Sequence, residues 1–182
     1  MGGASTRDSI LDAAERLIAR DGVQHLTIGR VAEEAAVSRG GLFYHFPSKE
    51  ALVQAMVKRM VAGWQRALEA QMADDSEPHG RLTRAYARLA LLQADGATGS
   101  TGALVGALIA GLAFDPRLLG PLHAQLREWQ AQSEAELDPA AAAVVRLTTH
   151  ALWTNDLLLT NVISPELLRQ IVARLEALTY PA

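Results

Sequence analysis

Polar and basic side chains gather in the first third of the chain, around the junction of short predicted helices. Lys49 lies in the first turn of a helix, where the helix dipole disfavours a cation, so its position indicates an anion outside the chain. The free N–H groups of such a turn also bind phosphate. Tyr44 and His45 have polar tips that can reach phosphate oxygens, and the hydroxyls of Thr27 and Ser38 lie nearby in the sequence. Taken alone, Lys49 is consistent with an ordinary solvated lysine on the surface. Together with the neighbouring hydroxyls and imidazole, it favours contact with phosphate.

Two adjacent glycines, Gly40 and Gly41, interrupt the helical stretch that carries these groups. Each glycine costs about 1 kcal/mol in helix propensity. A helix that presses against a DNA duplex gains from them, because a backbone without side chains can approach the wall of a groove. Close contact with another helix is the alternative explanation. Phe43 and Phe46 have no polar atoms, and we expect both to pack into a small core.

Two short helices on a tight turn are predicted to position these groups. The first covers about residues 27–34 with Thr27 as its cap, and the second covers about residues 38–45 with Ser38 as its cap. Only three residues separate the two helices. This spacing predicts a helix-turn-helix arrangement, in which the second helix lies across the first.

The rest of the chain is predicted to be helical as well. It has 182 residues, 49% of them hydrophobic, which is enough for a sizeable core. Apolar residues recur at three- and four-residue spacing, and no period-two segment of useful length is present. We therefore predict an all-α fold of about nine helices, one of them long and another within residues 103–112. Three later helices open with a capping residue before a proline, at Asp115-Pro116, Asp138-Pro139 and Ser164-Pro165.

Composition excludes several kinds of protein. The chain has no cysteine, which excludes a disulfide framework and a thiol nucleophile. The net charge of −3 argues against a general nucleic-acid binder, but residues 1–60 hold 8 Lys/Arg against 7 Asp/Glu, so any polyanion contact belongs there. No apolar signal region opens the chain, and the longest apolar run, Ala103–Phe114, is too short to span a bilayer. We expect a cytoplasmic protein without membrane contact.

The segment LTIGRVAEEAAVSRGGLFYHFPSKEALVQAM, residues 26–56, resembles the N-terminal DNA-binding domain of the TetR family of transcriptional regulators. The resemblance lies in T-I-x-x-V-A, A-x-V-S-x-G-x-L-F-Y-H-F and S-K-E-A-L, and it extends from residue 7 to about residue 57. Beyond that segment, only the number of helices and the length fit the family. The resemblance implies a regulator that binds double-stranded DNA.

The same resemblance implies where DNA is contacted. Ser38, Arg39 and Gly40 lie where the family meets the major groove, and Arg39 is the candidate for reading a base, since arginine can bind guanine O6 and N7 bidentately. A phosphate contact is the alternative for Arg39. Gly41 departs from the family, in which threonine, serine or alanine is common at this position. The glycine lacks the hydroxyl that threonine or serine could use to contact DNA. The residues implied to contact phosphates are Thr27, Tyr44, His45 and Lys49.

We predict two domains and a homodimer. Residues 1–47 form the DNA-binding domain, and residues 48–182 form a domain that binds a ligand and dimerises. A long helix over residues 48–73 links the two. A dimer is expected because one small domain reads few base pairs, and paired motifs bind palindromic half-sites about 34 Å apart. The last two helices carry apolar surfaces suited to a four-helix bundle, unless that surface is wholly internal core. The predicted interface residues are Leu152, Leu158, Leu159, Leu167, Leu168, Ile171, Val172 and Leu175.

A cavity for a small-molecule effector is expected among the remaining helices. For each candidate, ordinary core packing is the alternative, and Trp64 and Trp129 are the stronger candidates. Asp156 interrupts an apolar helix, and a buried carboxylate is costly unless paired. It forms either an interface hydrogen bond or the counter-charge of a cationic ligand. The candidate lining residues are Met60, Trp64, Tyr86, Phe114, His123, Trp129, Trp153 and Asp156.

We predict a repressor that binds a palindromic operator as a dimer and is released by a small hydrophobic effector, with a cationic effector as one form of it. Two other classes of protein compete with this prediction. One is a helical small-molecule-binding protein whose helix-turn-helix is only structural. The other is a cavity enzyme using His123 or His150 with a carboxylate. The chain has no H-E-x-x-H, G-x-S-x-G or P-loop motif, and no two of its five histidines are spaced i, i+4. We therefore predict no catalytic residues, no metal site and no cofactor.

Overall fold

The structure, a computed structural model, describes residues 5–94, 115–157 and 162–180. These residues form eight α-helices and two short 3-10 helices, with no strand among them, which confirms the predicted all-α fold. The expected helix at residues 103–112 lies outside the described residues. The chain divides into two compact units. The first is Met1–Val61 with Ala103–Leu122, and the second is Ala62–Gly102 with His123–Ala182.

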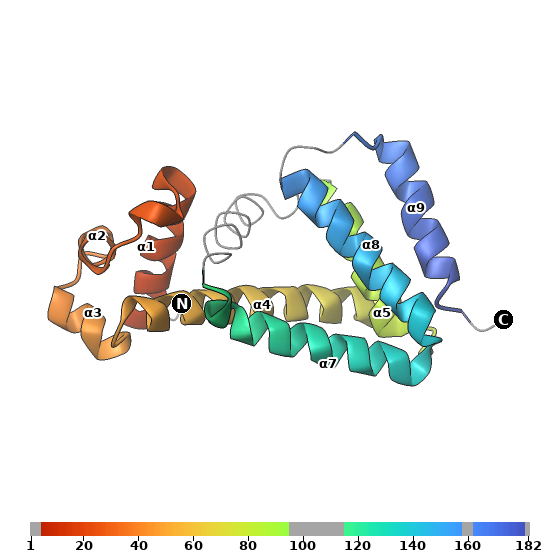
Figure 1. Ribbon diagram of the computed structural model, residues 1–182, viewed down its shortest axis with the longest axis horizontal. Helices are drawn as coiled ribbons and strands as arrows, with labels where there is room; N and C mark the ends of the chain where they lie inside the picture. Colours follow the sequence, from red (N-terminus) through yellow and green to blue (C-terminus); the bar gives the residue numbers. More distant parts are fainter. Residues whose placement is uncertain (1–4, 95–114, 158–161, 181–182) are drawn as a thin grey trace. The chain divides into compact units, whose positions relative to one another are not determined.

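The first unit is a small helical domain with its own core. Its helices pack around buried side chains that include Ile10, Val31, Leu42 and Phe46. Phe43 is different: 47% of it is exposed, so the prediction that it packs into the core is wrong. Its helices are α1 (Thr6–Asp21), η1 (Val23–His25), α2 (Ile28–Glu34), α3 (Arg39–His45), the first part of α4 (Lys49–Ala73) and η2 (Pro116–Leu119) (Figure 1).

The turn between α2 and α3 is fixed by backbone hydrogen bonds. Val37 N–H donates to Ala32 C=O at 2.9 Å, and Ala36 N–H donates to Glu33 C=O at 3.1 Å. This pair of bonds is the Schellman motif that ends many helices. Ala36 takes the left-handed conformation (φ 54°), a position where glycine is usual. The chain thus reverses within three residues, as the helix-turn-helix prediction requires.

Side-chain caps start the short helices at the predicted residues. The Ser38 hydroxyl accepts a hydrogen bond from Gly41 N–H at 3.0 Å, and the Thr27 hydroxyl accepts one from Arg30 N–H at 3.3 Å. Such caps satisfy N–H groups that have no partner within the helix. Ser48 does the same for α4 through Ala51 N–H at 3.1 Å. The predicted N-terminal caps at Thr27 and Ser38 are confirmed.

The second unit is a helical bundle built around α5. In it, α5 (Arg81–Ala94) packs against both α8 (Pro139–Leu157) and α9 (Pro165–Ala177), as Figure 1 shows. The later part of α4 and most of α7 (Gly120–Glu136) belong to the same unit. The core between α5, α8 and α9 is formed by Ala87, Ala90, Val145, Leu152, Leu168, Val172 and Leu175.

A fully buried arginine ties both ends of this unit together. Arg84 on α5 is 0% exposed, and its guanidinium contacts the Asp75 carboxylate at 2.7 Å. It also donates to the backbone C=O of His79 at 2.7 Å and to the Thr179 hydroxyl at 3.2 Å, and it lies 4.5 Å from the centre of the Tyr180 ring. A buried guanidinium needs such a complete set of partners. The linker before α5 and the end of the chain are therefore held by one side chain.

Gly80 makes this arrangement possible, because the chain passes very close to it. Its φ is +69°, and a Cβ there would lie 2.4 Å from the backbone oxygen of Thr179. Any side chain would have to displace that backbone, so the position requires glycine on both counts.

Replacing Asp75 by asparagine should destabilise the protein by about 3 kcal/mol, because it leaves the buried Arg84 without its counter-charge. The hydrogen bond from Arg84, together with the nearby positive charges, lowers the pKa of Asp75 to about 2. The carboxylate therefore stabilises the fold above the unfolded-state pKa of about 4, and this contribution is lost as the pH falls towards 2. Denaturant unfolding at pH 7 and at pH 3 measures both effects.

Asp74→Asn is the matched control, since Asp74 is exposed and forms no ion pair with the described residues. Equal stability of the Asp75 and Asp74 variants at pH 7 would show that the Arg84 cluster contributes nothing.

Candidate DNA interface and effector pocket

One side of α3 is open to solvent and carries most of the predicted DNA-contacting residues. Tyr44 is 86% exposed, and its ring meets the His45 ring edge-on with centroids 5.1 Å apart. Ser38, Arg39 and Gly40 are exposed, as are Thr27 at the start of α2 and Lys49 at the start of α4. Leu42 and Phe46, at i and i+4, are buried on the other side. The exposed groups therefore lie together around one short helix that is held by its opposite face.

Packing against the residues that the structure describes does not explain the glycines of α3. Among those residues, a Cβ built on Gly40 would meet only the Ser38 hydroxyl, at 3.9 Å, which is ordinary contact. On Gly41 it would meet the same oxygen at 3.3 Å, a tight but adjustable contact. Close contact with another described helix, the alternative explanation, therefore does not account for Gly40. Among the described residues, none covers the surface over Gly40.

Most arginines of the first unit are neutralised by carboxylates of the same unit. Arg16 and Arg20 both bind Glu34, with N–O distances of 3.1 and 3.2 Å. Their hydrogen bonds, that from Arg16 above all, lower the pKa of the Glu34 carboxyl. Arg30 binds Asp21 in the same way. These pairs remove charge from the surfaces of α1 and α2.

Arg39 and Lys49 differ from those residues, since neither forms an ion pair with any residue that the structure describes. Unpaired, exposed cations beside a side-chain-poor helix present positive charge to a polyanion. The Arg39 guanidinium rests near α2, where a Cβ on Gly29 would lie 2.9 Å from one of its nitrogens. Gly29 thus provides the space in which the Arg39 side chain lies.

The second unit gathers four of its aromatic side chains into one cluster. Tyr86 on α5 lies at the centre, with ring centroids 5.8 Å from Trp129 and 5.7 Å from Trp153. Trp64 on α4 lies 5.1 Å from Trp153. The sequence thus predicted four aromatic residues that the structure brings together. His150 on α8 completes the cluster at 5.7 Å from both Tyr86 and Trp153.

Two of these side chains form a partly buried polar pair. The Tyr86 hydroxyl is hydrogen-bonded to His150 Nε2. Burial, with the positive charge of Arg146 acting in the same direction, lowers the pKa of His150 to about 4, and burial raises the pKa of Tyr86. At neutral pH the imidazole of His150 is therefore uncharged. Trp129 Nε1 donates to Gln65 at 2.9 Å, whereas the buried indole N–H of Trp153 has no hydrogen-bond partner among the described residues.

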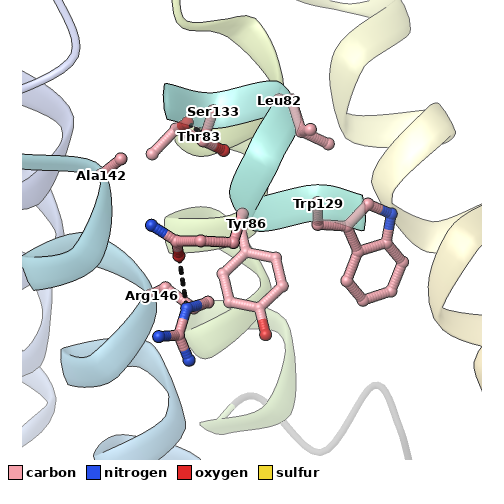
Figure 2. Close-up of a pocket in the computed structure, with 8 residues that line it drawn as sticks. Leu82, Thr83, Tyr86, Trp129, Ser133, Ala142 and Arg146 are labelled. Atoms are coloured by element: carbon pink, nitrogen blue, oxygen red, sulfur yellow. Dashed lines mark hydrogen bonds between the residues drawn. The ribbon is translucent and has the colours of Figure 1, made fainter. Parts of the chain in front are cut away.

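A narrow hollow, partly open to solvent, lies beside this cluster between α5, α7 and α8. Figure 2 shows Tyr86 between Arg146 and Trp129, with the hydroxyls of Thr83 and Ser133 above. Those two hydroxyls bind each other at 2.8 Å. Tyr86 and Trp129 are the predicted ligand residues that line it. The full lining is Leu82, Thr83, Tyr86, Trp129, Gln130, Ser133, Ala142 and Arg146.

The other predicted ligand residues are not brought to this hollow. His123 is exposed on α7, and Met60 is half-buried in the first unit. Phe114 lies outside the described residues. Asp156 belongs to α8, but its side chain is not among those described, so its role as a counter-charge stays a prediction.

The predicted interface residues divide into buried and accessible ones. Leu152, Leu168, Val172 and Leu175 are buried in the core of the chain itself, so they offer little surface to a second copy. Leu167 is 47% exposed and Ile171 is half-buried. Their part in dimerisation stays a prediction. Leu158 and Leu159 lie outside the described residues.

Sequence reasoning missed Arg146 in the lining of the hollow and considered His150 only as a residue of a cavity enzyme. The signal was present, because Arg146, His150 and Trp153 follow one another at i, i+4 and i+7 along α8. That spacing places them on one face of a helix.

In the part of the chain that the structure describes, no helix is long and apolar enough to cross a bilayer.

A small domain with an exposed second helix on a tight turn defines the class of helix-turn-helix DNA-binding proteins. Two family models match the chain. "Bacterial regulatory proteins, tetR family" matches residues 10–56, and "Tetracyclin repressor-like, C-terminal domain" matches residues 80–180. The chain therefore belongs to the TetR family of transcriptional regulators. Members of this family are generally not enzymes.

Individual relatives agree with this assignment. The transcriptional regulator TtgR of Pseudomonas putida is 44% identical over 52 residues, which span 29% of this chain but only 25% of TtgR. UidR of Escherichia coli is 38% identical over 52 residues, or 29% of this chain and 26% of UidR. The multidrug-binding protein EbrR, solved with imidazole, is 26% identical with a TM-score of 0.70, covering 98% of both chains.

Proposed function

We propose that this protein is a dimeric repressor that binds a palindromic operator and is released from it by a small hydrophobic effector. The observation that carries the proposal is the solvent-exposed face of α3, where Tyr44 is 86% exposed beside the open surface of Gly40. A helical protein that only bound small molecules would have no need of an uncovered tyrosine beside two unpaired cations. As a DNA-bound regulator, the protein works in the cytoplasm.

The proposed contacts follow from exposure and charge. Arg39 reads a base in the major groove, and Ser38, Gly40 and Gly41 let the backbone of α3 approach the groove wall. Phosphates on either side are held by Thr27, Tyr44, His45 and Lys49. Binding of labelled DNA from the region flanking the gene, against scrambled DNA of equal length, tests the function. Equal affinity for both duplexes would refute it.

Effector release is proposed to act through α4. This helix has 25 residues, roughly 38 Å at 1.5 Å per residue, and it belongs to both units. Lys49 begins it and Trp64 joins the aromatic cluster of the second unit. A ligand that favours one position of Trp64 shifts the population of α4 positions, and DNA affinity falls by the difference in ligand affinity between the two states. The multidrug-binding protein EbrR has been solved with ethidium, and it is 26% identical to this chain with a TM-score of 0.71, which supports a small-molecule effector.

Lys49→Ala should weaken operator binding several-fold and lower the slope of log affinity against log salt by about 1, because one phosphate contact is lost. Tyr44→Phe should weaken binding with little change in slope, because a neutral hydroxyl displaces no counterion. Anisotropy titrations from 50 to 200 mM salt measure both quantities. Lys58→Ala, on the exposed side of α4, is the control. If the Lys49 and Lys58 variants show the same slope of log affinity against log salt, the proposed phosphate contact of Lys49 is refuted.

Gly40→Ala should change stability and DNA binding in opposite directions. The structure has room for the methyl group, so the variant gains about 1 kcal/mol of stability from helix propensity. On DNA the same methyl group meets the groove wall, and operator affinity should fall at least ten-fold. Thermal unfolding and operator titration of one preparation test this. A variant that is both more stable and fully active would show that α3 does not approach the duplex at Gly40.

The proposed dimer interface is an apolar face on α8 and α9 that the chain leaves uncovered. On α8, Val144 is 48% and Leu147 is 57% exposed, and on α9 Leu167 is 47% exposed, with Leu178 at 45% just beyond its end. Exposed apolar side chains in such number indicate an interaction surface. Two helices from each of two copies would form the four-helix bundle expected from the sequence.

Leu147→Glu should convert the dimer to a monomer, because the carboxylate would be buried at the interface without a partner. Since Leu147 is more than half exposed in the single chain, the helical content should be unchanged. Sedimentation velocity gives the mass, and circular dichroism gives the helicity. Thr154→Glu, at another exposed position of α8, is the control. A Leu147 variant that stays dimeric would place the interface elsewhere.

A further inference from the structure

We propose that Arg7 on α1 is a further phosphate contact to the operator, outside the helix-turn-helix. The inference rests on the proposed function, because it adds a residue to the DNA interface of that function. None of the contacts proposed above lies on α1. The observation that carries the inference is the position of the Arg7 side chain, which lies over the residue at the junction of α3 and α4.

The Arg7 guanidinium is located by its contact with an aromatic ring. Arg7 is exposed in the first turn of α1, and its guanidinium carbon lies 5.1 Å from the centre of the Phe46 ring. Phe46 ends α3, directly after His45 and three residues before Lys49, and Figure 1 shows the first turn of α1 beside this junction. The positive charge of Arg7 therefore lies next to the segment that joins two proposed phosphate contacts.

The contact with the ring leaves the hydrogen-bond donors of Arg7 available. A cation–π contact draws the charge to the ring but supplies no oxygen as an acceptor. The Arg7 side chain donates no hydrogen bond to any residue that the structure describes. Asp8, which is next in the sequence, accepts a hydrogen bond from the Ser5 hydroxyl at 2.6 Å. The N–H groups of a guanidinium match the oxygens of a phosphate, so Arg7 has donors for an external anion.

Arg7 also lacks the carboxylate partner that other arginines of the first unit have. It forms no ion pair with the described residues, and among the described arginines of this unit only Arg39, proposed to read a base, shares this property. A charge that the chain does not neutralise is available to a polyanion. The neutralised arginines are Arg16 and Arg20 with Glu34, Arg30 with Asp21, Arg59 with Asp12 and Glu15, and Arg117 with Asp115.

The position of Arg7 matters as much as its lack of a partner. Lys58 is also exposed and forms no ion pair with the described residues. It follows Lys49 at a distance of roughly 14 Å along α4, at 1.5 Å per residue. Arg7, in contrast, is in contact with the end of α3 itself. This difference distinguishes Arg7 from an ordinary surface cation of the same unit.

Arg7 has a structural role as well, since it lies over Phe46, which is 2% exposed. Loss of the ring contact alone would loosen the end of α3 and weaken DNA binding by the same factor at every salt concentration. Loss of a phosphate contact has a different signature. It lowers the number of counterions released on binding, and the slope of log affinity against log salt falls. The slope therefore separates the two roles.

Arg7→Gln should lower this slope by about 1 for each subunit bound to the operator, and Arg7→Lys, which keeps the charge, should retain the slope. Arg16→Gln is the matched control, because it removes the same charge from the same helix at a side chain already bound to Glu34 at 3.1 Å. Anisotropy titrations of the full-length variants measure the slopes, and melting temperatures show whether each is folded. Equal slopes in Arg7→Gln and Arg16→Gln would overturn the inference, as would an equal loss of slope in Arg7→Lys and Arg7→Gln.

Chemically altered operator DNA locates the contact. When one phosphate at a time is replaced by an uncharged methylphosphonate, wild-type affinity should fall at each contacted phosphate. At one position in each half-site, Arg7→Gln should be insensitive to the replacement, whereas Arg16→Gln should remain sensitive. If every replacement that weakens the wild type weakens Arg7→Gln by the same factor, Arg7 holds no phosphate.

Operator binding by the wild-type protein separates the two proposals. Specific binding, with equal slopes in Arg7→Gln and Arg16→Gln, refutes the Arg7 contact and leaves the proposed function intact. Absence of specific DNA binding by the wild type refutes the proposed function, and the Arg7 contact with it.

Discussion

The anchoring of α3 by one face is the constraint on which the DNA interface depends. A helix of seven residues is unstable in isolation, because the free-energy cost of nucleating it exceeds the stabilisation that so few hydrogen bonds contribute. Here the Ser38 cap starts it, and Leu42 and Phe46 are almost wholly buried beneath it. With those residues fixed, the helical period decides where all the others point. Tyr44 and Gly40 face solvent because Leu42 and Phe46 do not.

The same geometry explains which parts of the first unit could be predicted from sequence. Caps at Thr27, Ser38 and Ser48 depend on local hydrogen bonds, and local rules locate them. The burial of Phe43 was predicted from its residue type, and type was a poor guide. One side of a seven-residue helix has room for two anchors, and Leu42 and Phe46 occupy it at i and i+4. Phe43, one position along, is turned out of the core.

In the second unit, sequence predicted that four aromatic residues turn inward, as cavity lining or as core, but not which charged residues surround them. Trp64, Tyr86, Trp129 and Trp153 are large and apolar, so any compact bundle of these helices brings them inward. The partners of Arg84 could not be predicted, because Thr179 is 95 residues away and Asp75 lies in a linker whose conformation depends on the tertiary fold. The linker before α5 is part of a buried ion pair.

Gly29 has a consequence for how such regulators diverge. Its missing side chain leaves the space in which the Arg39 guanidinium rests against α2. A single methyl group there would alter none of the residues proposed to touch DNA, yet it would crowd that guanidinium from behind and change its direction. Duplicate copies of such a gene could therefore acquire separate targets through one substitution at a residue that never meets the double helix.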